Sequence, residues 1–240
     1  MKKETVITPE YIKNLSYTDF VGLINQWNVL PGSHVTLSKW AYFSGLNKKS
    51  NLLEVACTTG FSSRELSLLS GCSGEGFDLS EKSIKMANYN RNEYASNINF
   101  SYKVADGYEY KSKKPFTHIV VGASLGFFPD PQKMLEKCIS MLEDGGYILA
   151  SPFYVTKPLP YSLVKRAQKV FDITPTGVPY KEIMKLYNKL EIIFEERNNL
   201  VKETGEELNY YCKCTIDRAC KMLKSRIKKY MRLCTIDSMK

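Results

Sequence analysis

The sequence lacks the features of a membrane protein or of a disulfide-stabilised secreted protein. No apolar run approaches the roughly 18 residues that a membrane-spanning helix needs, and the first ten residues contain no signal-peptide core. The seven cysteines are odd in number and lack the spacing of a disulfide framework. The only close pair, Cys212 and Cys214, offers too few ligands for a zinc site, so we predict no metal. We therefore expect reduced thiols and a cytoplasmic protein.

Net positive charge is small over most of the chain and concentrated at its end. The formal net charge is +9, and residues 212–240 contain nine Lys and Arg against two Asp, which leaves +7 there and +2 for residues 1–211. Such a tail is either the solvated face of a helix or a surface that attracts an anionic partner such as RNA. With 240 residues, of which 43% are hydrophobic, the chain can bury the core of one α/β domain with additions.

The most informative stretch is 51–65, where a buried strand leads through small residues into a helix. Leu52, Leu53 and Val55 form the short apolar run of a parallel strand that is covered on both faces. The turn that follows contains no bulky side chain except Cys57, and Ser62 or Ser63 is expected to cap the helix. Such a turn points backbone N–H groups and a helix N-terminus at one spot, which suits an anionic or carboxylate-bearing ligand.

This stretch resembles the first motif of the class I S-adenosylmethionine (SAM) methyltransferases. In that family an acidic residue ends the first strand and a glycine-rich turn follows. Glu54 and Gly60 match this pattern, whereas Ala56 and Thr58 stand where two glycines are usual. The resemblance implies that the cofactor lies on Glu54, Ala56, Cys57, Thr58 and Gly60. The alternative is a generic strand-to-helix turn of an α/β domain.

Two later strands end in acidic residues, in register with the family. Residues 74–78 form a short strand that ends at Asp78, and Ser80 is expected to cap the next helix, 81–89. The resemblance implies that Asp78, followed by Leu79, binds the ribose of the cofactor. Residues 98–104 alternate as a third strand and lead into Asp106, Gly107 and Tyr108. At the position of Asp106 the family has an acidic residue that accepts a hydrogen bond from the adenine amino group. Asp-Gly is also a plain turn signal.

The fourth and fifth strands complete the resemblance. Residues 116–122 form the fourth strand, with His118 where the family usually has Asp, and we interpret this histidine as a strand-entry residue. Ala123, Ser124 and Phe128 follow, where the family places the cofactor and the methyl acceptor. Asp130 opens a helix that ends before Gly145 and Gly146, and residues 147–151 form strand five.

The N-terminal and C-terminal parts are expected to be helical. Residues 1–47 read as a helical lid with starts at Thr8, Asp19, and Thr36 or Ser38. In residues 48–240, the predicted methyltransferase domain, residues 152–190 read as a substrate-side insertion with helices at 162–172 and 179–190. Residues 191–195 read as strand six, and 206–234 as a basic amphipathic helix. We find no seventh strand, so the antiparallel edge strand of the family is either absent or cut off.

The predicted fold class is α/β, with a Rossmann-like, doubly wound, mostly parallel sheet that has helices on both faces. The lid aromatics are expected to shield a reacting centre from water, with packing as the alternative for each. Two groups of candidates follow, neither with a motif behind it. Catalytic candidates are His34, Tyr17 and Tyr154; substrate-binding candidates are Trp27, Trp40, Phe128 and Tyr161.

The function that this resemblance implies is methyl transfer from SAM to a nitrogen or oxygen atom of a small molecule or peptide, in natural-product biosynthesis. An RNA methyltransferase that uses the basic tail is the first alternative, although no OB barrel or RRM is evident. A dinucleotide-dependent oxidoreductase would need Gly-x-Gly-x-x-Gly after the first strand, which the sequence lacks. A non-catalytic binding module on the same fold is the last alternative. We expect no membrane partner.

Overall fold

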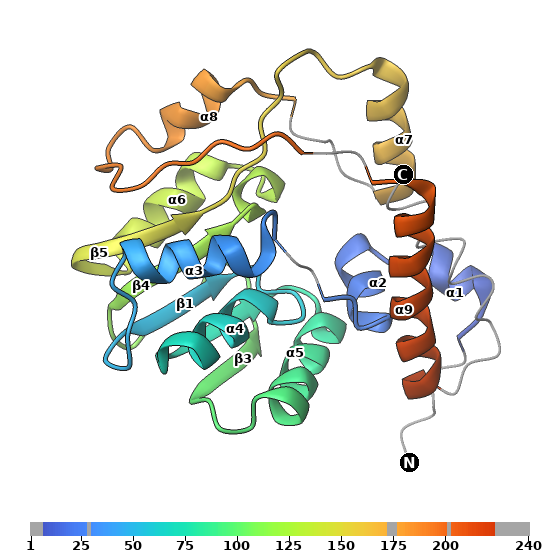
Figure 1. Ribbon diagram of the computed structural model, residues 1–240, viewed down its shortest axis with the longest axis horizontal. Coiled ribbons are helices and arrows are strands. Elements are labelled where there is room, and N and C mark those ends of the chain that lie inside the picture. Colours follow the sequence, from blue (N-terminus) through green and yellow to red (C-terminus); the bar gives the residue numbers. More distant parts are fainter. Residues whose placement is uncertain (1–6, 28–29, 172–176, 201–202, 224–240) are drawn as a thin grey trace.

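The centre of the protein is a sheet of five parallel strands in the order β3-β2-β1-β4-β5. The computed structural model describes residues 7–27, 30–171, 177–200 and 203–223. The order reverses between β1 and β4, as in a doubly wound fold, and helices cover both faces (Figure 1). This confirms the predicted α/β, Rossmann-like class. The strands are β1 (Asn51–Val55), β2 (Ser73–Asp78), β3 (Phe100–Val104), β4 (Phe116–Gly122) and β5 (Leu142–Ala150).

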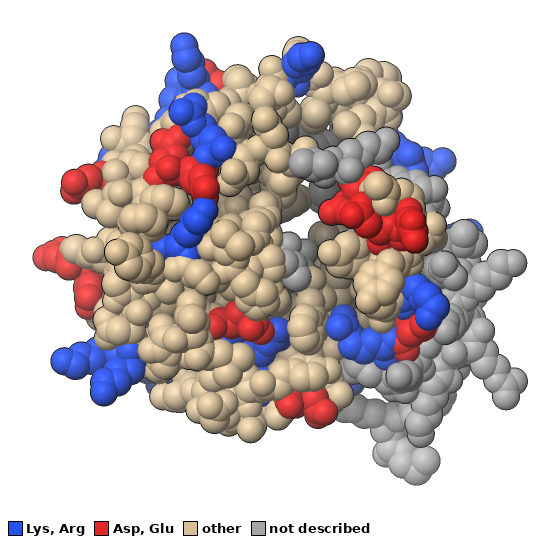
Figure 2. All heavy atoms as spheres, viewed as in Figure 1, with Lys and Arg blue, Asp and Glu red and all other residues tan. Residues whose placement is uncertain are grey.

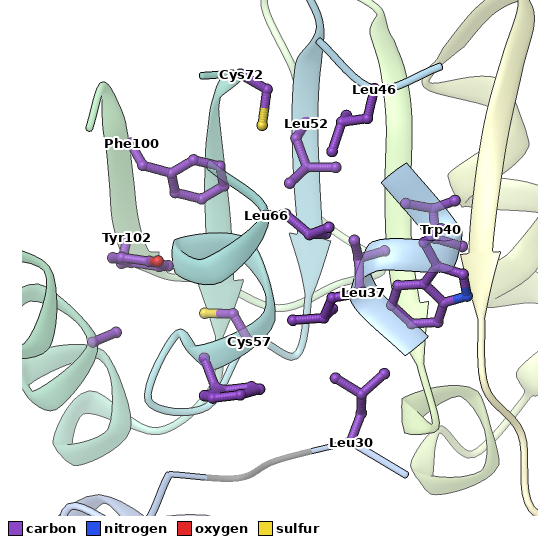
Figure 3. Packing of buried hydrophobic residues seen from close by; sticks show 14 of the residues in the cluster. Leu30, Leu37, Trp40, Leu46, Leu52, Cys57, Leu66, Cys72, Phe100 and Tyr102 are labelled. Carbon is purple, nitrogen blue, oxygen red and sulfur yellow. The ribbon is translucent and has the colours of Figure 1, made fainter. Parts of the chain in front are cut away.

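Helices α3 (Ser33–Phe43), α4 (Phe61–Ser70) and α5 (Glu81–Tyr94) cover one face of the sheet. The core on this side joins Leu52 of β1 and Phe100 of β3 to Leu37 of α3 and Leu66 of α4 (Figure 3). All four side chains are almost completely buried. Apolar residues recur at helical spacing in α3 and α4 because only one stripe of each helix meets the sheet.

The other face is covered by α6 (Pro131–Ser140), α8 (Tyr180–Leu186) and the short 3-10 helix η1 (Ser124–Phe127). Leu53 of β1 and Ile119 of β4 pack against Met134 of α6 in this second core. No helix connects β3 to β4; instead the ring of Tyr110 stacks on Phe77, with centroids 4.4 Å apart. An aromatic side chain thus covers the part of β2 that a crossover helix would otherwise cover.

A helical module lies beside the sheet and is assembled from both ends of the chain. It contains α1 (Pro9–Lys13), α2 (Tyr17–Leu23) and α9 (Gly205–Leu223) (Figure 1). Phe20 and Ile24 from the N-terminal part pack against Ile216 and Ala219 of α9. The remaining helix, α7 (Tyr161–Phe171), follows the aromatic and proline-rich connection after β5.

Several local expectations are confirmed. Thr8 caps α1, Ser80 caps α5 and Asp130 caps α6, each by accepting a backbone N–H in the first turn. Gly71 ends α4 in the left-handed conformation. Strand four spans the predicted residues, and the predicted helices at 162–172 and 179–190 form as α7 and α8, although α8 ends at Leu186.

Other expectations are wrong. Residues 191–195 are exposed and do not form strand six, so β5 is an edge of the described sheet. Strand β5 begins at Leu142, earlier than predicted, because the Asp-Gly-Gly segment continues the strand through a bulge. Helix α3 begins at Ser33 and helix α4 at Phe61, each after a left-handed glycine and without the predicted serine or threonine cap. Asp19 lies inside α2, which Ser16 caps.

The C-terminal prediction falls partly outside the described residues. Helix α9 confirms the start of the expected helix, while residues 224–234 and most of the basic tail lie beyond the last described residue. In the part of the chain that the structure describes, no helix combines the length and apolar character needed to cross a membrane.

Candidate functional site

The carboxyl ends of β1, β2 and β3 meet at one edge of the sheet. Val55 lies in register with Phe77, and Asp78 with Val104, so the segments that follow these strands are neighbours. The N–H group of Ala105 donates to the carbonyl of Asp78 at 3.1 Å, which extends the pairing into the turn after β3. The structure therefore brings the turn 56–60, Asp78 and Asp106 to a common edge, where α/β sheets bind ligands.

The turn after β1 has the backbone of a glycine-rich loop without all of its glycines. Ala56, Thr58 and Gly60 have φ angles of 51°, 45° and 73°, all in the left-handed region. For a β-branched residue such as Thr58 this conformation is a true outlier, and left-handed non-glycine residues cost about 1–2 kcal/mol each. The strained turn therefore keeps the backbone path of the family motif at both replaced positions, as binding loops do when a ligand must approach the main chain.

Asp78 joins the end of β2 to this turn. One carboxylate oxygen accepts the N–H of Thr58 at 3.0 Å, and the other accepts the N–H of Ser80 at 2.9 Å. Burial raises the pKa of Asp78, and the two backbone N–H groups oppose that shift. Since a carboxylate has about four lone-pair positions, each oxygen can still accept one hydroxyl hydrogen from a ligand. Leu79, the next residue, is exposed at this edge.

Glu54 lies beneath the turn and holds the start of α4. Its carboxylate accepts both the backbone N–H of Ser63, at 3.1 Å, and the hydroxyl of Ser63, which also contacts the hydroxyl of Tyr102 at 2.9 Å. Burial raises the pKa of Glu54 from 4.5 to about 7. Tyr102 in turn donates to the carbonyl of Gly60 at 3.2 Å. Ser63 is the third residue of α4, and the Glu54 carboxylate from β1 accepts its N–H in place of a side-chain cap.

Gly60 and Cys57 are fixed by close packing. A Cβ atom on Gly60 would lie 2.7 Å from the ring of Tyr102, so no larger residue fits there. The thiol of Cys57 is buried, and burial raises its pKa well above the usual value. Cys57 therefore stays a neutral packing residue below the turn, and only its backbone is available at the edge.

The segment after β3 forms a second wall of the edge. Asp106 is exposed and accepts the N–H of Tyr108 at 2.9 Å. The ring of Tyr108 packs edge-on against Phe128, with centroids 5.8 Å apart. Gly107 is buried between them and the next helix, because a Cβ atom there would lie 3.0 Å from Phe128. Ser124, half-buried after β4, donates to the carbonyl of Val121 at 2.7 Å, and Ala123 precedes it.

The N-terminal module is bonded directly to the turn and to α5. Thr59 donates to the carbonyl of Gln26 at 2.7 Å. The side chains of Asn25 and Asn90 exchange two hydrogen bonds of 2.8 and 2.9 Å, and Asn90 also donates to the carbonyl of Thr59 at 3.1 Å. These bonds place the N-terminal module against the turn.

The lid is also anchored at the start of α5. Asp19 accepts the hydroxyl of Ser80 at 2.6 Å and pairs with Lys82 at 2.8 Å. Near this ion pair α2 and α5 are in direct contact. A Cβ atom on Gly22 of α2 would lie 2.4 Å from the backbone nitrogen of Ser83 of α5. Helices α2 and α5 thus pack backbone to backbone, close to Asp78.

The structure places the other predicted substrate and catalytic residues in different surroundings. Trp40 is buried in the core between α3 and the sheet, as Figure 3 shows. Tyr161 is 74% exposed on α7. Tyr154 packs edge-on against Tyr180 of α8, at 5.4 Å between ring centroids. His34 is exposed on α3, with its ring 5.5 Å from that of Phe61. Their surroundings give Trp40 and Tyr154 packing partners of their own.

Tyr17 is the first residue of α2, and Trp27 follows that helix. Trp27 contacts Phe61 and Tyr94, with centroids 6.4 and 5.4 Å away, and also faces two arginines, Arg64 and Arg218. Tyr17 is half-buried, and burial raises the pKa of its phenol, so it keeps its proton. His118 stands in β4 where the family usually has Asp. It is buried within the strand, and its ring contacts the carbonyl of Ser44 at 3.1 Å.

Sequence analysis missed four residues that shape the site: Tyr102, Asn25, Asn90 and Arg64. Tyr102 could have been found, because it occupies an inward position of the alternating third strand. The asparagine pair joins residues that are 65 positions apart, and no local pattern indicates such a contact. Among the described residues no cluster of His, Cys, Asp and Glu is arranged to hold a metal ion.

Figure 2 shows a hollow in the middle of the face, between the body that carries the sheet and the side where α9 lies. Lys and Arg side chains on this face are interspersed with Asp and Glu. The arrangement can hold a ligand with hydroxyl groups on Asp78 and bring its neighbouring parts to the turn and to the wall formed by Tyr108 and Phe128.

Comparisons with known proteins agree with this geometry. A family model described as a methyltransferase domain matches residues 46–235. Among curated proteins, the chain is similar to ubiquinone biosynthesis O-methyltransferases. It is 23% identical to the one from Shewanella sp. (strain ANA-3) over 151 residues, which are 63% of this chain and 57% of that protein. With the one from Coxiella burnetii it shares 29% identity over 54% of this chain and 55% of that protein. The chain thus spans little more than half the length of these relatives.

Solved structures share the fold. The MccD protein aligns with a TM-score of 0.68 at 24% identity, over 85% of this chain and 95% of that chain. A SAM-dependent methyltransferase from Geobacter sulfurreducens in complex with S-adenosylhomocysteine gives a TM-score of 0.63 at 15% identity, over 90% and 87%. Phosphoethanolamine N-methyltransferase 2 from Haemonchus contortus in complex with SAM gives 0.61 at 19% identity, over 79% and 45%.

Proposed function

Because this chain belongs to the family of methyltransferase domains, which are SAM-dependent enzymes, we propose that it transfers a methyl group to a nitrogen or oxygen atom of a small-molecule or peptide acceptor. The observation that supports this most directly is the edge where the strained turn 56–60, Asp78 and Asp106 meet. Each comes from the end of a different parallel strand.

The residues at this edge fit the parts of SAM. Asp78 would accept from the ribose hydroxyls, because its two oxygens are already oriented by Thr58 and Ser80. Asp106 would accept from the adenine amino group. The turn 56–60 and the start of α4 would face the methionine carboxylate, since a helix N-terminus and its N–H groups favour an anion.

The cofactor would supply an electrophilic methyl group, so the chain needs little covalent chemistry of its own. Its residues would hold the acceptor atom in line, and positioning of this kind contributes roughly 7–11 kcal/mol of barrier reduction. The lid would exclude water through the bond from Thr59 of the turn to Gln26, and through Asn25, which is bonded to Asn90. Phe128 would form part of the acceptor wall.

Roles for the catalytic candidates follow from their surroundings. Tyr17 would act as a hydrogen-bond donor to the acceptor and not as a base, because burial raises its pKa. His34 would accept a proton only if the acceptor reaches the outer side of α3. The relatives differ on the acceptor: some are named for O-methylation and others for N-methylation, so both nucleophiles are retained.

Calorimetric titration with SAM, S-adenosylhomocysteine and NAD tests the cofactor. We expect binding of the first two and not of NAD; binding of NAD alone would favour an oxidoreductase. A screen of candidate acceptors with mass-spectrometric detection of added methyl groups tests the reaction. Binding of SAM without methylation of any acceptor would favour a non-catalytic module.

A further inference from the structure

A tryptophan that contacts two arginines lies next to the turn. The guanidinium carbon of Arg64, on α4, is 4.7 Å from the centroid of the Trp27 ring, and that of Arg218, on α9, is 5.0 Å away. Arg64 is only 1% exposed. Three elements that are far apart in sequence thus bring two guanidinium groups and an indole together.

Each of these side chains keeps a buried donor without a partner among the described residues. The atoms are Nε1 of Trp27, Nη1 of Arg64 and Nε of Arg218. Most buried polar atoms in proteins are hydrogen-bonded, so three unpaired N–H groups around one ring call for an explanation. Leaving such donors unpaired costs about 1–3 kcal/mol each, and more for charged groups.

Charge around the cluster is also unbalanced. Glu65 accepts two hydrogen bonds from Arg64, at 3.0 and 2.9 Å. Arg218 donates to the carbonyl of Asn25 and makes no ion pair that balances its charge in the described residues. The next carboxylate on α9, Asp217, pairs with Lys213 at 2.8 Å. Burial lowers the pKa of Arg218, and the charge of Arg64 lowers it further.

From this geometry we propose that Trp27, Arg64 and Arg218 form a binding site for the carboxylate or phosphate group of a ligand. An anion there would satisfy the three donors and balance the second guanidinium. Arginine suits this role because its planar, always charged group binds carboxylates and phosphates through paired N–H donors. The indole N–H would add a neutral donor.

The site adjoins the turn. The ring centroid of Phe61, the residue after Gly60, lies 5.8 Å from the guanidinium carbon of Arg64. It lies 6.4 Å from the ring centroid of Trp27. Asn25, which accepts from Arg218, is linked through Asn90 to Thr59. The anion is therefore either the carboxylate of the cofactor or an acidic group of the acceptor. That choice rests on the proposed function, whereas the anion site itself does not.

Inorganic phosphate, titrated at constant ionic strength, tests the site directly. Fluorescence of Trp27 is the signal, and Trp27→Phe serves to subtract the contribution of Trp40. We expect Arg218→Gln to weaken phosphate binding about tenfold, because a hydrogen bond to a charged group contributes roughly 1.5–3 kcal/mol. Lys213→Gln removes the same charge from an exposed position of the same helix and should change the affinity less than about twofold.

Two measurements keep the test decisive if Arg218→Gln loosens the lid. The melting temperature without phosphate reports stability, and the phosphate-induced increase reports binding. Trp27→Phe keeps an aromatic ring against the arginines but lacks the N–H group, and should reduce that increase while the unliganded melting temperature changes little. Equal phosphate responses in wild type, Arg218→Gln and Trp27→Phe would show that the proposal is wrong.

Titration with S-adenosylhomocysteine and with methylthioadenosine, which lacks the carboxylate, identifies the source of the anion. If Arg218→Gln weakens binding of S-adenosylhomocysteine about tenfold and leaves binding of methylthioadenosine unchanged, the site holds the cofactor carboxylate. If it weakens neither but abolishes the phosphate response, the site serves an acidic acceptor. Phosphate binding that depends on Arg218 in a protein that binds no adenosyl compound would refute the proposed function and support the anion site.

Discussion

At the scale of single residues, Ala56 shows how this chain departs from its family without changing the backbone. The residue has φ = 51°, a region that favours glycine, and its side chain is half-buried. Alanine loses less conformational entropy than glycine on folding, but the strain at this φ costs at least as much free energy as that difference. The same balance applies at Thr58. We infer that ligand binding, and not stability, accounts for the conformation of the turn.

Ala56→Gly should therefore stabilise the protein, against the usual direction for a substitution by glycine. We expect the free energy of unfolding to rise by about 0.5–1 kcal/mol, measured by denaturant titration. The control is Ala123→Gly, at φ = −100°, where alanine is unstrained. There the unfolding free energy should fall by about 0.5–1 kcal/mol. Equal losses in both variants would contradict strain at Ala56.

Glu54 should make stability depend on pH. Burial raises its folded-state pKa from 4.5 to about 7, so between these values the folded protein keeps a proton that the unfolded chain has lost. The free energy of unfolding should therefore fall as pH rises through this range, by at most about 1.4 kcal/mol per pH unit. Glu54→Gln, which keeps an acceptor for Ser63, should flatten this slope. Denaturant titration from about pH 5 to about pH 8 measures it, and parallel curves would argue against a buried, protonated Glu54.

Asp78→Asn tests the ribose assignment more cleanly than alanine. Alanine would also remove both acceptors for the N–H groups of Thr58 and Ser80, whereas asparagine keeps one oxygen. We expect affinity for S-adenosylhomocysteine to fall at least tenfold, since a donor replaces an acceptor in a buried polar contact. Circular dichroism serves as the folding control. Unchanged affinity would remove Asp78 from the site.

At the scale of elements, the lid depends on a close approach of α2 to α5. Gly22→Ala should force these helices apart, because the added Cβ atom would lie 2.4 Å from the backbone of Ser83. Overpacking of this kind costs about 1–3 kcal/mol. We expect faster hydrogen exchange in α2 and weaker cofactor binding, with exchange in β1 and β4 unchanged. Gly205→Ala is a useful contrast, because its Cβ atom would meet nothing within 4 Å and its φ lies outside the left-handed region.

The five strands could be predicted, including the edge strands β3 and β5, whereas the exposed path of residues 191–195 and two helix starts could not. Buried parallel strands such as 116–122 are marked by continuous apolar residues, and caps such as Ser80 by local chemistry. Residues 191–195 have the composition of a strand but no partner strand, so they stay exposed. The helix starts after Gly32 and Gly60 were missed because the backbone conformation of glycine, and not a side-chain cap, sets them.

At the scale of the whole molecule, α9 completes the lid. Ile216 of α9 is fully buried against the first helices of the chain. Ile216→Ala should cost about 2–5 kcal/mol of local stability. We expect hydrogen exchange to accelerate in α1 and α2 and to stay slow in the sheet. Tyr210→Ala, on the exposed side of the same helix, should leave exchange unchanged. Acceleration in the sheet as well would mean that lid and sheet unfold together.

The predicted site is partly a property of this whole assembly. The turn, Asp78 and Asp106 could be placed at one edge from strand endings alone, because parallel strands share a carboxyl edge. The arginine cluster could not, because Arg218 reaches Trp27 only after α9 has packed on the lid. Trp40 was assigned to the substrate from its place in the lid sequence, but the structure gives it core neighbours.

The packing of Ile216 and Ala219 against Phe20 and Ile24 also orders events during synthesis. The ribosome makes α1 and α2 before it makes the sheet and α9, so the apolar side of these two helices is covered only once α9 has been made. Until then that side is open to chaperones. A nascent chain halted before residue 205 would therefore carry a formed sheet and an unfinished entrance.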